Sequence, residues 1–246
     1  MAGRMNEIFK EYENIHKGEE AVLVAGGPSL EKFVPLEDVI YAGVNHIGKH
    51  RLFDQSVPGS IKLDYYFFGD RNRYMPKDFK VLRQKFGACI LNGREHPGHL
   101  TKKEVESLGG KAFEQTNQRH GIKRNERGSN SMFDCVVKSF LSRRYGHGFP
   151  EDISKSPCYG NSVVTPVMQF LLYTGVSKIY LVGADCAGGP SFGIKGPDFY
   201  GNKREYKRVI PDWNDFKVYL NEVKPDVRII SINPVGLKGY FEDIYY

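Results

Sequence analysis

Residues 21–33, AVLVAGGPSLEKF, decide the fold of this chain. The first five residues form a short apolar run, which is typical of a strand buried on both faces of a parallel sheet. The run ends at Gly26 and Gly27, and a helix is expected to begin at Leu30 and Glu31. A strand, a glycine turn and a helix in immediate succession indicate an α/β protein.

Further apolar runs of strand length follow along the chain. We expect strands at 39–44, 64–69, 88–91, 178–183 and 227–232. Several of these runs are separated by segments that can hold a helix. This alternation predicts a Rossmann-like, doubly wound and mainly parallel sheet with right-handed crossovers.

Two helices are expected from the spacing of apolar residues. In residues 5–15 the apolar positions recur every three or four residues, and Gly18 should end that helix. The clearer pattern covers 163–172, with Ser162 as the expected N-cap and Gly175 as the C-terminal stop. Each of these helices leads into an expected strand.

Length and composition favour one domain over residues 1–246. A chain of 246 residues can bury a large core, and 40% apolar with 26% charged residues excludes disorder for most of it. Residues 94–157 are rich in Lys, Arg, His, Gly and Asn, so we interpret them as an insertion or lid. No repeat or evident linker divides the chain.

The sequence contains no sign of a membrane span or a disulfide framework. No window approaches the roughly 18 apolar residues of a bilayer span, and the first twenty residues lack the apolar region of a signal peptide. We therefore expect a cytoplasmic protein. The four cysteines stand singly, which predicts reduced and mostly buried thiols at Cys89, Cys135, Cys158 and Cys186.

The charge balance suits a small anionic ligand. Lys and Arg number 35 against 29 Asp and Glu, a net charge of +6. Such a surplus fits either an anionic small molecule or non-specific contact with nucleic acid. The aromatic residues fall in strand-like runs and are not interleaved with basic residues, so nucleic-acid binding is not expected.

The glycine turn Gly26, Gly27, Pro28 and Ser29 is the first candidate site. In a doubly wound sheet the ligand crevice lies outside the carboxyl ends of the strands, where backbone N–H groups of such a turn can bind phosphate. The turn is neither a GxGxxG fingerprint nor a P-loop. A plain tight turn is the alternative interpretation.

Residues 160–189, GNSVVTPVMQFLLYTGVSKIYLVGADCAGG, are the second candidate. Asp185 follows the strand and should point into the crevice, where it can bind a ribose, hold a metal ion through water or act as a base. The alternative interpretation is that Asp185 caps the following loop. Gly160, Asn161 and Ser162 can offer donors to the same ligand from the start of the helix.

Basic and histidine-bearing loops are further candidates. Residues 199–208 offer Tyr200, Lys203, Arg204 and Tyr206, which could contact a phosphate, although a solvated charge run is the equal alternative. The segment 94–157 carries four histidines, each of which could be a base or simply a loop residue: His96, His99, His120 and His147.

Together these pieces resemble one group of proteins. It contains the bacterial sialyltransferases of glycosyltransferase family 42 and the related Maf-type flagellin glycosylation proteins, with which the archaeal hydroxymethyl-pterin diphosphokinases share a domain. The resemblance rests on VLVAGGPSLEKF, on Asn45 in AGVNH and on the segment 160–189. The closing RIISINPVGLKGYFEDI is similar to the last strand and helix of the sialyltransferases.

The resemblance implies a glycosyltransferase that binds a nucleotide sugar, for example a CMP-linked acidic sugar, and transfers the sugar to a glycan or protein acceptor. It implies no resident cofactor. The glycine turn would bind the nucleotide phosphates, Asn45 the phosphate or sugar, and Asn161 with Ser162 the nucleotide. Asp185 would bind the ribose or form part of the polar rim of the pocket, and it is the one catalytic candidate.

One departure leaves the general base unidentified. The sialyltransferases place a histidine base downstream of the strand that ends in G-x-D, whereas this chain has no histidine after His147. If the chain is a transferase, another group must deprotonate the acceptor.

Two other functions remain open. The first is a diphosphokinase acting on a pterin-like alcohol, in which Asp185 and Asp70 would hold Mg²⁺ between the phosphates. The second is a nucleotide-binding module without turnover.

The shared-site hypothesis makes three structural predictions. Asp185 should lie close to the glycine turn, with Asn45 and Asn161 on the rim of the same pocket. Residues 188–208 should form a lid. Gly27→Val should weaken nucleotide binding and leave the fold intact.

Overall fold

The computed structural model describes residues 7–54, 56–68, 89–92, 102–107, 109–116, 148–186 and 203–246. The side chains of 89–92, Lys102, Thr116 and 203–208 are not part of that description. Most of the expected insertion 94–157 and most of the expected lid 188–208 therefore lie outside the described residues.

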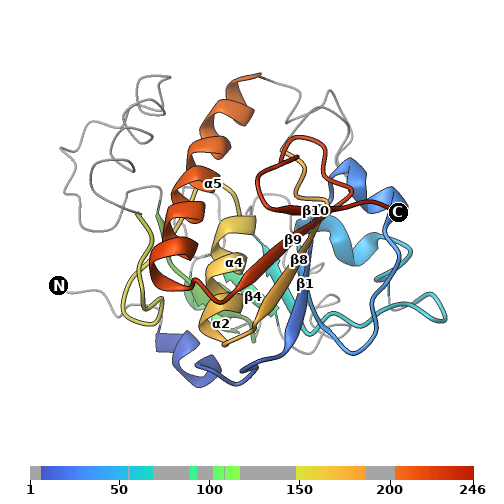
Figure 1. Ribbon diagram of the computed structural model, residues 1–246. Helices are drawn as coiled ribbons and strands as arrows, with labels where there is room; N and C mark the ends of the chain where they lie inside the picture. The colour runs from blue at the N-terminus through green and yellow to red at the C-terminus, as the bar shows by residue number, and fades with distance from the viewer. Residues whose placement is uncertain are drawn as a thin grey trace.

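Within the described residues, eight strands form one sheet in the order β10-β9-β8-β1-β2-β3-β4-β5 (Figure 1). Every pairing in this sheet is parallel, which confirms the expected fold class. The strands are β1 (Glu20–Val24), β2 (Ile40–Val44), β3 (Tyr65–Phe68), β4 (Cys89–Asn92), β5 (Lys111–Phe113), β8 (Lys178–Val182), β9 (Arg228–Ile232) and β10 (Glu242–Ile244). A separate parallel pair joins β6 (Gln115–Thr116) to β7 (Cys158–Tyr159).

The six expected strands are confirmed, and two edge strands are additions. β5 lies within the segment that we interpreted as an insertion, and it pairs with β4 at one edge of the main sheet after the short helix α2 (Lys102–Ser107). β10 forms the other edge, where the resemblance implied a closing helix. Both strands are three residues long, which is too short for an apolar pattern to identify.

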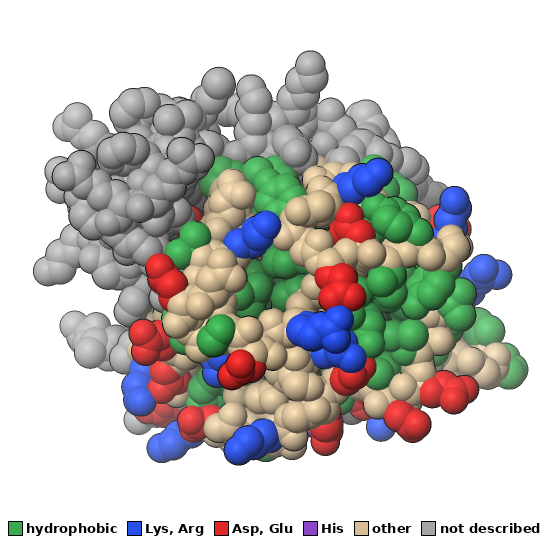
Figure 2. Space-filling view, viewed as in Figure 1, with side chains coloured by type: hydrophobic (Ala, Val, Ile, Leu, Met, Phe, Trp, Pro, Cys, Tyr) green, Lys and Arg blue, Asp and Glu red, His purple; other side chains and the backbone are tan. Residues whose placement is uncertain are grey.

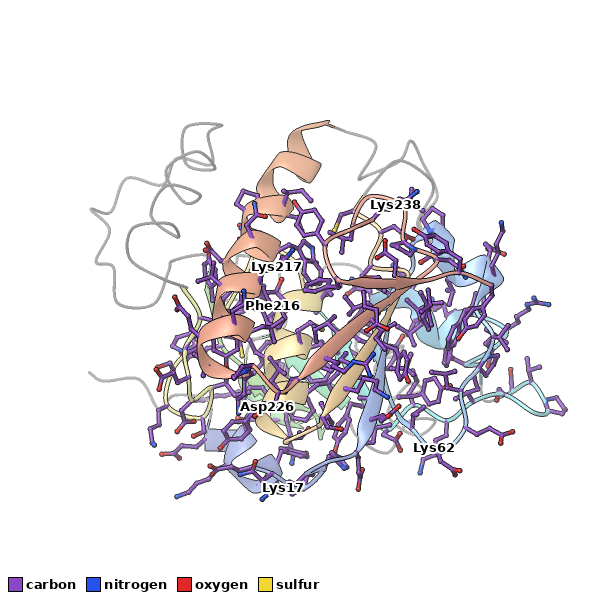
Figure 3. The ribbon with its side chains drawn as sticks, in the orientation of Figure 1. Lys17, Lys62, Phe216, Lys217, Asp226 and Lys238 are labelled. Carbon is purple, nitrogen blue, oxygen red and sulfur yellow. The ribbon has the colours of Figure 1, made fainter. Side chains whose placement is uncertain are left out.

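Different helices cover the two faces of the sheet. One face packs against α4 (Val164–Tyr173) and α5 (Lys203–Val223), and also against η1 (Glu7–Tyr12). The other face carries the short 3₁₀ helices η2 (Pro28–Lys32) and η3 (Asn45–Lys49). In Figure 3, Phe216 and Lys217 mark the course of α5 across the first of these faces, and Phe216 is fully buried there.

Two local expectations about the helices are wrong and a third is confirmed. The first helix is a 3₁₀ helix over residues 7–12 instead of a long amphipathic α-helix. The N-cap of α4 is Val163, while the Ser162 hydroxyl accepts only a 3.3 Å hydrogen bond from the Val164 N–H. Gly175, with φ of +88°, follows the C-cap as expected.

The expected lid loop is wrong over its last residues. Residues 203–208 form the first turns of α5, and the helix continues to Val223 through Pro211. Among the side chains of α5 that are described, Val209, Trp213, Phe216 and Leu220 form the buried stripe that anchors this helix. The charged start of α5 hid the helix from a search for apolar spacing.

The position of β1 determines where a ligand can bind. β1 lies between β2 and β8, with Val24 paired to Gly43 on one side and to Val182 on the other. The chain leaves β1 toward β2 in one direction, while β8, β9 and β10 extend the sheet in the other. Such a switch of direction opens a crevice at the carboxyl ends of the two neighbouring strands.

Among the described residues, no helix combines the length and the apolarity that a membrane span requires.

Candidate functional site

A pocket lies at the carboxyl ends of β1, β2 and β8. It brings together the motifs that the sequence singled out, because its lining includes Gly26, Gly27, Pro28, Asn45, Ser162 and Asp185. The other lining residues are Ala25, Val44, His46, Val163, Val164, Gly183, Ala184, Cys186, Val209 and Trp213. Ser29, Gly160 and Asn161 are not among the lining residues.

Asp185 is bound directly to the glycine turn. Its Oδ2 accepts a 2.7 Å hydrogen bond from the Ser29 N–H, and its Oδ1 accepts a 3.2 Å bond from the Val235 N–H. The residue is only 4% exposed. This contact confirms that Asp185 lies beside the glycine turn. The described bonds of its carboxylate run to the turn after β1 and to the loop after β9, and not to the loop that follows Asp185 itself.

Burial raises the pKa of Asp185 above its ordinary value, while its hydrogen bonds with Ser29 and Val235 act in the opposite direction. Both carboxylate oxygens accept backbone N–H groups. These two bonds direct the carboxylate toward the loops that it holds.

The glycine turn is packed tightly against the end of β8. The Gly27 N–H donates to the Gly183 carbonyl at 2.8 Å, and the Gly183 N–H donates to the Ser29 hydroxyl at 2.7 Å. A Cβ on Gly27 would lie 2.5 Å from both Asp185 Oδ2 and the Gly183 carbonyl. We therefore expect Gly27→Val to strain the turn as well as weaken binding, which argues against the sequence-based expectation that the fold stays intact.

The same contacts limit which amides of the turn can reach a ligand. The N–H groups of Gly27 and Ser29 already have acceptors, and Pro28 has no N–H. Among the described residues, the Gly26 N–H has no protein acceptor and lies on the pocket lining. The turn thus offers one amide to a ligand.

The second wall of the pocket is the start of α4. Ser162 and Val163 precede this ten-residue helix and line the pocket. Within the described structure, their N–H groups have no protein acceptor. Amides at a helix N-terminus carry partial positive charge, so this wall favours an anionic group.

A buried aspartate holds this wall in place. The Asp212 carboxylate of α5 accepts the Asn161 backbone N–H at 2.6 Å and the Asn161 side-chain amide at 2.9 and 3.0 Å. Asp212 is fully buried. Asn161 thus faces α5, and it positions the pocket wall from behind instead of lining it.

Asn45 turns the chain at the end of β2. Its φ of +53° is left-handed, which Asn tolerates better than most residues. The Tyr66 hydroxyl donates to the Asn45 carbonyl and accepts the Gly48 N–H at 3.1 Å. These bonds hold η3 against β3 and place His46, the next residue, on the pocket lining.

The remaining wall is apolar. Val209 and Trp213 of α5 line the pocket beside Cys186, and the Trp213 indole N–H donates to the Cys186 sulfur at 3.2 Å. Burial raises the pKa of the Cys186 thiol to about 12. The pocket therefore combines a polar end at the glycine turn and α4 with an apolar end at α5.

Three residues of this site were not among the candidates from sequence. His46 stands beside Asn45 in the quoted AGVNH, so its position after a strand was a usable signal. Asp212 and Trp213 lie on α5, which the sequence pattern did not identify. Acidic residues on helices are usually solvated, so the burial of Asp212 had no sequence signal.

Several candidates from sequence fall where no side chain is described. Tyr200 and Asp70 lie outside the described residues, as do His96, His99, His120 and His147. Lys203, Arg204 and Tyr206 belong to the first turns of α5, but their side chains are not described. Among the described residues, no group of three or more His, Cys, Asp or Glu side chains is arranged to hold a metal ion.

The visible surface mixes the two signs of charge. Figure 2 shows Lys and Arg side chains interspersed with Asp and Glu over the part of this face that is coloured. Described ion pairs include Lys178 with Glu20, and Arg228 with Glu242 at 2.6 Å. Figure 3 places Lys238 near the carboxyl ends of the strands and Lys17 at the opposite end.

No family model matches the chain, and no curated protein matches it. The solved structures that are similar include the sialyltransferase CstII from Campylobacter jejuni in complex with CMP-3FNeuAc, at 11% identity and a TM-score of 0.48, covering 92% of this chain and 85% of that one. The same enzyme in complex with cytidine-5'-monophosphate gives 12% identity, a TM-score of 0.43, and coverage of 87% and 79%.

A third similar structure is the sialyltransferase CST-II in complex with a trisaccharide acceptor and CMP, at 10% identity and a TM-score of 0.45, with coverage of 87% and 80%. At such identities and TM-scores the likeness assigns neither a family nor an activity to this chain.

Proposed function

We propose that this chain is a glycosyltransferase-like protein that binds a nucleotide sugar in the pocket beside Asp185. The sugar would pass to a glycan or protein acceptor. The observation that carries the proposal is the convergence of the Gly26 turn, Asn45, Ser162 and Asp185 on one pocket at the switch point of the sheet. The resemblance of these same sequence segments to the sialyltransferase group also supports it.

The two ends of the pocket suit the two parts of a nucleotide. The N–H groups of Gly26, Ser162 and Val163 can donate to phosphate oxygens at the N-terminus of α4. The wall of Val209, Trp213 and Cys186 is apolar and can pack against a nucleobase or the ring carbons of a sugar.

The same donors would assist the transfer. As the bond between the sugar and the phosphate oxygen breaks, negative charge grows on the departing nucleotide. Fixed N–H groups at a helix N-terminus stabilise that charge without reorganising. The acceptor hydroxyl must lose its proton to a base as its oxygen bonds to the anomeric carbon.

No described contact favours the magnesium-dependent diphosphokinase. Both oxygens of Asp185 accept backbone N–H groups. A chelator distinguishes the glycosyltransferase from the diphosphokinase. A diphosphokinase needs Mg²⁺, so a chelator would abolish its activity. A glycosyltransferase of the proposed type should be insensitive to the chelator.

Calorimetric titration tests the binding part of the proposal. CMP, UMP, GMP and ATP are titrated separately, together with cytidine and uridine, which lack phosphate. At least one nucleotide should bind, and the matching nucleoside should bind at least about tenfold more weakly because it cannot contact the α4 N-terminus. If no nucleotide binds at millimolar concentration, the proposal fails.

A pair of Ser162 variants locates the phosphate. Ser162→Asp adds a carboxylate at the start of α4, where negative charge suits the helix but repels a phosphate. Its melting temperature should equal or exceed that of the wild type, while nucleotide affinity falls by at least about tenfold. Ser162→Asn is the neutral control and should retain most of the affinity.

Turnover separates an enzyme from a binding module. The donor whose nucleotide binds is incubated without acceptor, so that water takes the sugar. Slow hydrolysis supports a transferase, whereas tight binding without release of nucleotide from any donor supports the module.

A further inference from the structure

His46 occupies a defined position at the pocket. β2 ends beside the glycine turn, because Gly43 pairs with Val24 of β1. Asn45 then turns the chain, and the Tyr66 hydroxyl holds its carbonyl. His46, half-buried, follows at the start of η3 and lines the pocket.

The other two titratable residues on the described lining either hold the pocket loops or keep their own proton. They are Asp185 from the end of β8 and its neighbour Cys186. Asp185 uses both oxygens to accept backbone N–H groups. The Cys186 thiol has its pKa raised to about 12 by burial, so it keeps its own proton.

An imidazole has the chemistry that this site otherwise lacks. It titrates near neutral pH, and its neutral form can accept a proton and later release it to water. The Ser162 hydroxyl and the Asn45 amide on the same lining do not take up protons near neutral pH. Within the described part of the pocket, His46 is therefore the one side chain suited to act as a base.

We propose that His46 is the general base that takes the proton of the acceptor hydroxyl, an inference that rests on the proposed function. In the step, the neutral imidazole nitrogen takes the proton and the acceptor oxygen forms a bond to the anomeric carbon. The bond from that carbon to the phosphate oxygen breaks, and the nucleotide leaves with the electron pair. The imidazolium then returns its proton to solvent.

Donor hydrolysis with and without His46 tests the step. The probes are CMP-N-acetylneuraminic acid and UDP-glucose as donors, with CMP and UMP as the matching ligands. His46→Gln removes the base but keeps a polar side chain of similar reach. Donor turnover should fall at least about 100-fold, while the Kd for the nucleotide changes by less than about threefold.

His16→Gln is the matched control. His16 contacts Glu19 at 3.0 Å and the Tyr65 hydroxyl at 2.6 Å, just before β1 and so at the opposite end of the strands from the pocket. The same replacement there should leave both turnover and nucleotide affinity unchanged. A loss of activity in both variants would indicate a structural effect and overturn the assignment.

The pH dependence supplies a readout that a structural role would not move. A base works in its deprotonated form, so wild-type turnover should fall as the pH drops below about 6.5. The residual turnover of His46→Gln should lack this decline. A variant that retains wild-type turnover, or that retains the acidic decline, overturns the proposal.

NMR gives an answer that does not depend on turnover. The imidazole signal of His46 is identified by its absence in His46→Gln and is titrated with and without CMP or UMP. A bound phosphate should raise the pKa of His46 by roughly 0.5 units or more, because negative charge stabilises the imidazolium. If neither nucleotide binds, the titration is repeated with whichever of GMP and ATP binds in calorimetry, and the proposed function itself fails only if none of the four binds. If one binds and the His46 pKa does not move, the proposed function stands and His46 is excluded.

Discussion

The backbone N–H of Ser29 donates a 2.7 Å hydrogen bond to Oδ2 of Asp185, 156 residues further along the chain. Asp185 also accepts the Val235 N–H through Oδ1 and the Gly236 N–H through its carbonyl. One buried residue thus joins the loops that follow β1, β8 and β9. We expect Asp185 to influence ligand binding through the turn that it holds.

Replacing Asp185 by Asn should test this positioning role. An amide offers one acceptor oxygen where the carboxylate offers two, so either the Ser29 or the Val235 N–H would face an NH₂ group. We expect a loss of about 1–3 kcal/mol in the free energy of unfolding. Urea unfolding of both proteins measures it, and an unchanged midpoint would contradict the role.

The stability difference should also depend on pH. Burial raises the folded-state pKa of Asp185 above the ordinary 3.8. A carboxyl group whose pKa is raised on folding adds to the free energy of unfolding. This addition is fully present below the pKa of the unfolded state and is lost as the pH rises through the pKa of the folded state. The advantage of the wild type over Asp185→Asn should therefore be larger near pH 4 than at pH 7, and a difference that grows with pH would refute this.

Gly27 should tolerate no side chain, for reasons of space alone. Its backbone has an ordinary φ of −76°, yet a Cβ would meet Asp185 Oδ2 and the Gly183 carbonyl at 2.5 Å. Gly27→Ala should lower the free energy of unfolding by more than about 2 kcal/mol. Thermal melting detects this directly.

Gly59 supplies the comparison for Gly27. It has a positive φ of +77° but open space around the position of a Cβ. Gly59→Ala should cost only the backbone strain, about 1 kcal/mol. Equal losses in the two variants would mean that crowding at Gly27 is relieved by small shifts of the turn.

The sheet and the place of the pocket were predictable because local patterns determine them. The central strands are continuous apolar runs, as in 21–25 and 178–183, and parallel pairing then brings their carboxyl ends to one edge. The acceptor to which each backbone N–H group of the site donates was not predictable. Whether Ser29 donates to a ligand or to Asp185 depends on a contact across 156 residues.

The α5 wall was missed for a different reason. Its first residues, KREYKR, are mostly charged, and Pro211 lies within the helix. In the sequence, the start of α5 therefore looks like a basic loop that precedes a helix. The fully buried Asp212 adds to this difficulty, because its partner Asn161 lies 51 residues earlier in the chain.

Asp212 should prove essential for the second wall of the pocket. Asp212→Ala would leave the Asn161 backbone N–H and side-chain amide without their acceptor. We expect a loss of about 2–4 kcal/mol in stability together with weaker nucleotide binding. Asn161→Ala should cost less, because Asp212 keeps its bond from the backbone N–H.

A double-mutant cycle decides whether the two residues act as one unit. Asp212→Ala, Asn161→Ala and the double variant are unfolded in urea under one condition. The coupling energy should be about 0.5–3 kcal/mol. Strict additivity would show that Asp212 stabilises α5 without holding the Asn161 turn.

Trp213 should serve as an intrinsic fluorescent probe of ligand binding in the pocket. It is the single tryptophan of the chain, it is 2% exposed, and it lines the pocket with its indole N–H directed to Cys186. A nucleotide that packs against the α5 wall changes the surroundings of the indole. Tryptophan emission should therefore change on titration and give the same Kd as calorimetry.

The variants described above make this fluorescence measurement specific. Ser162→Asp should shift the fluorescence and calorimetric curves together, because the repelled phosphate and the indole belong to one ligand site. Trp213→Phe should abolish the signal while keeping most of the apolar contact. Saturable calorimetric binding that leaves the Trp213 emission unchanged would place the ligand away from α5, and the assignment of the apolar end of the pocket would then fail.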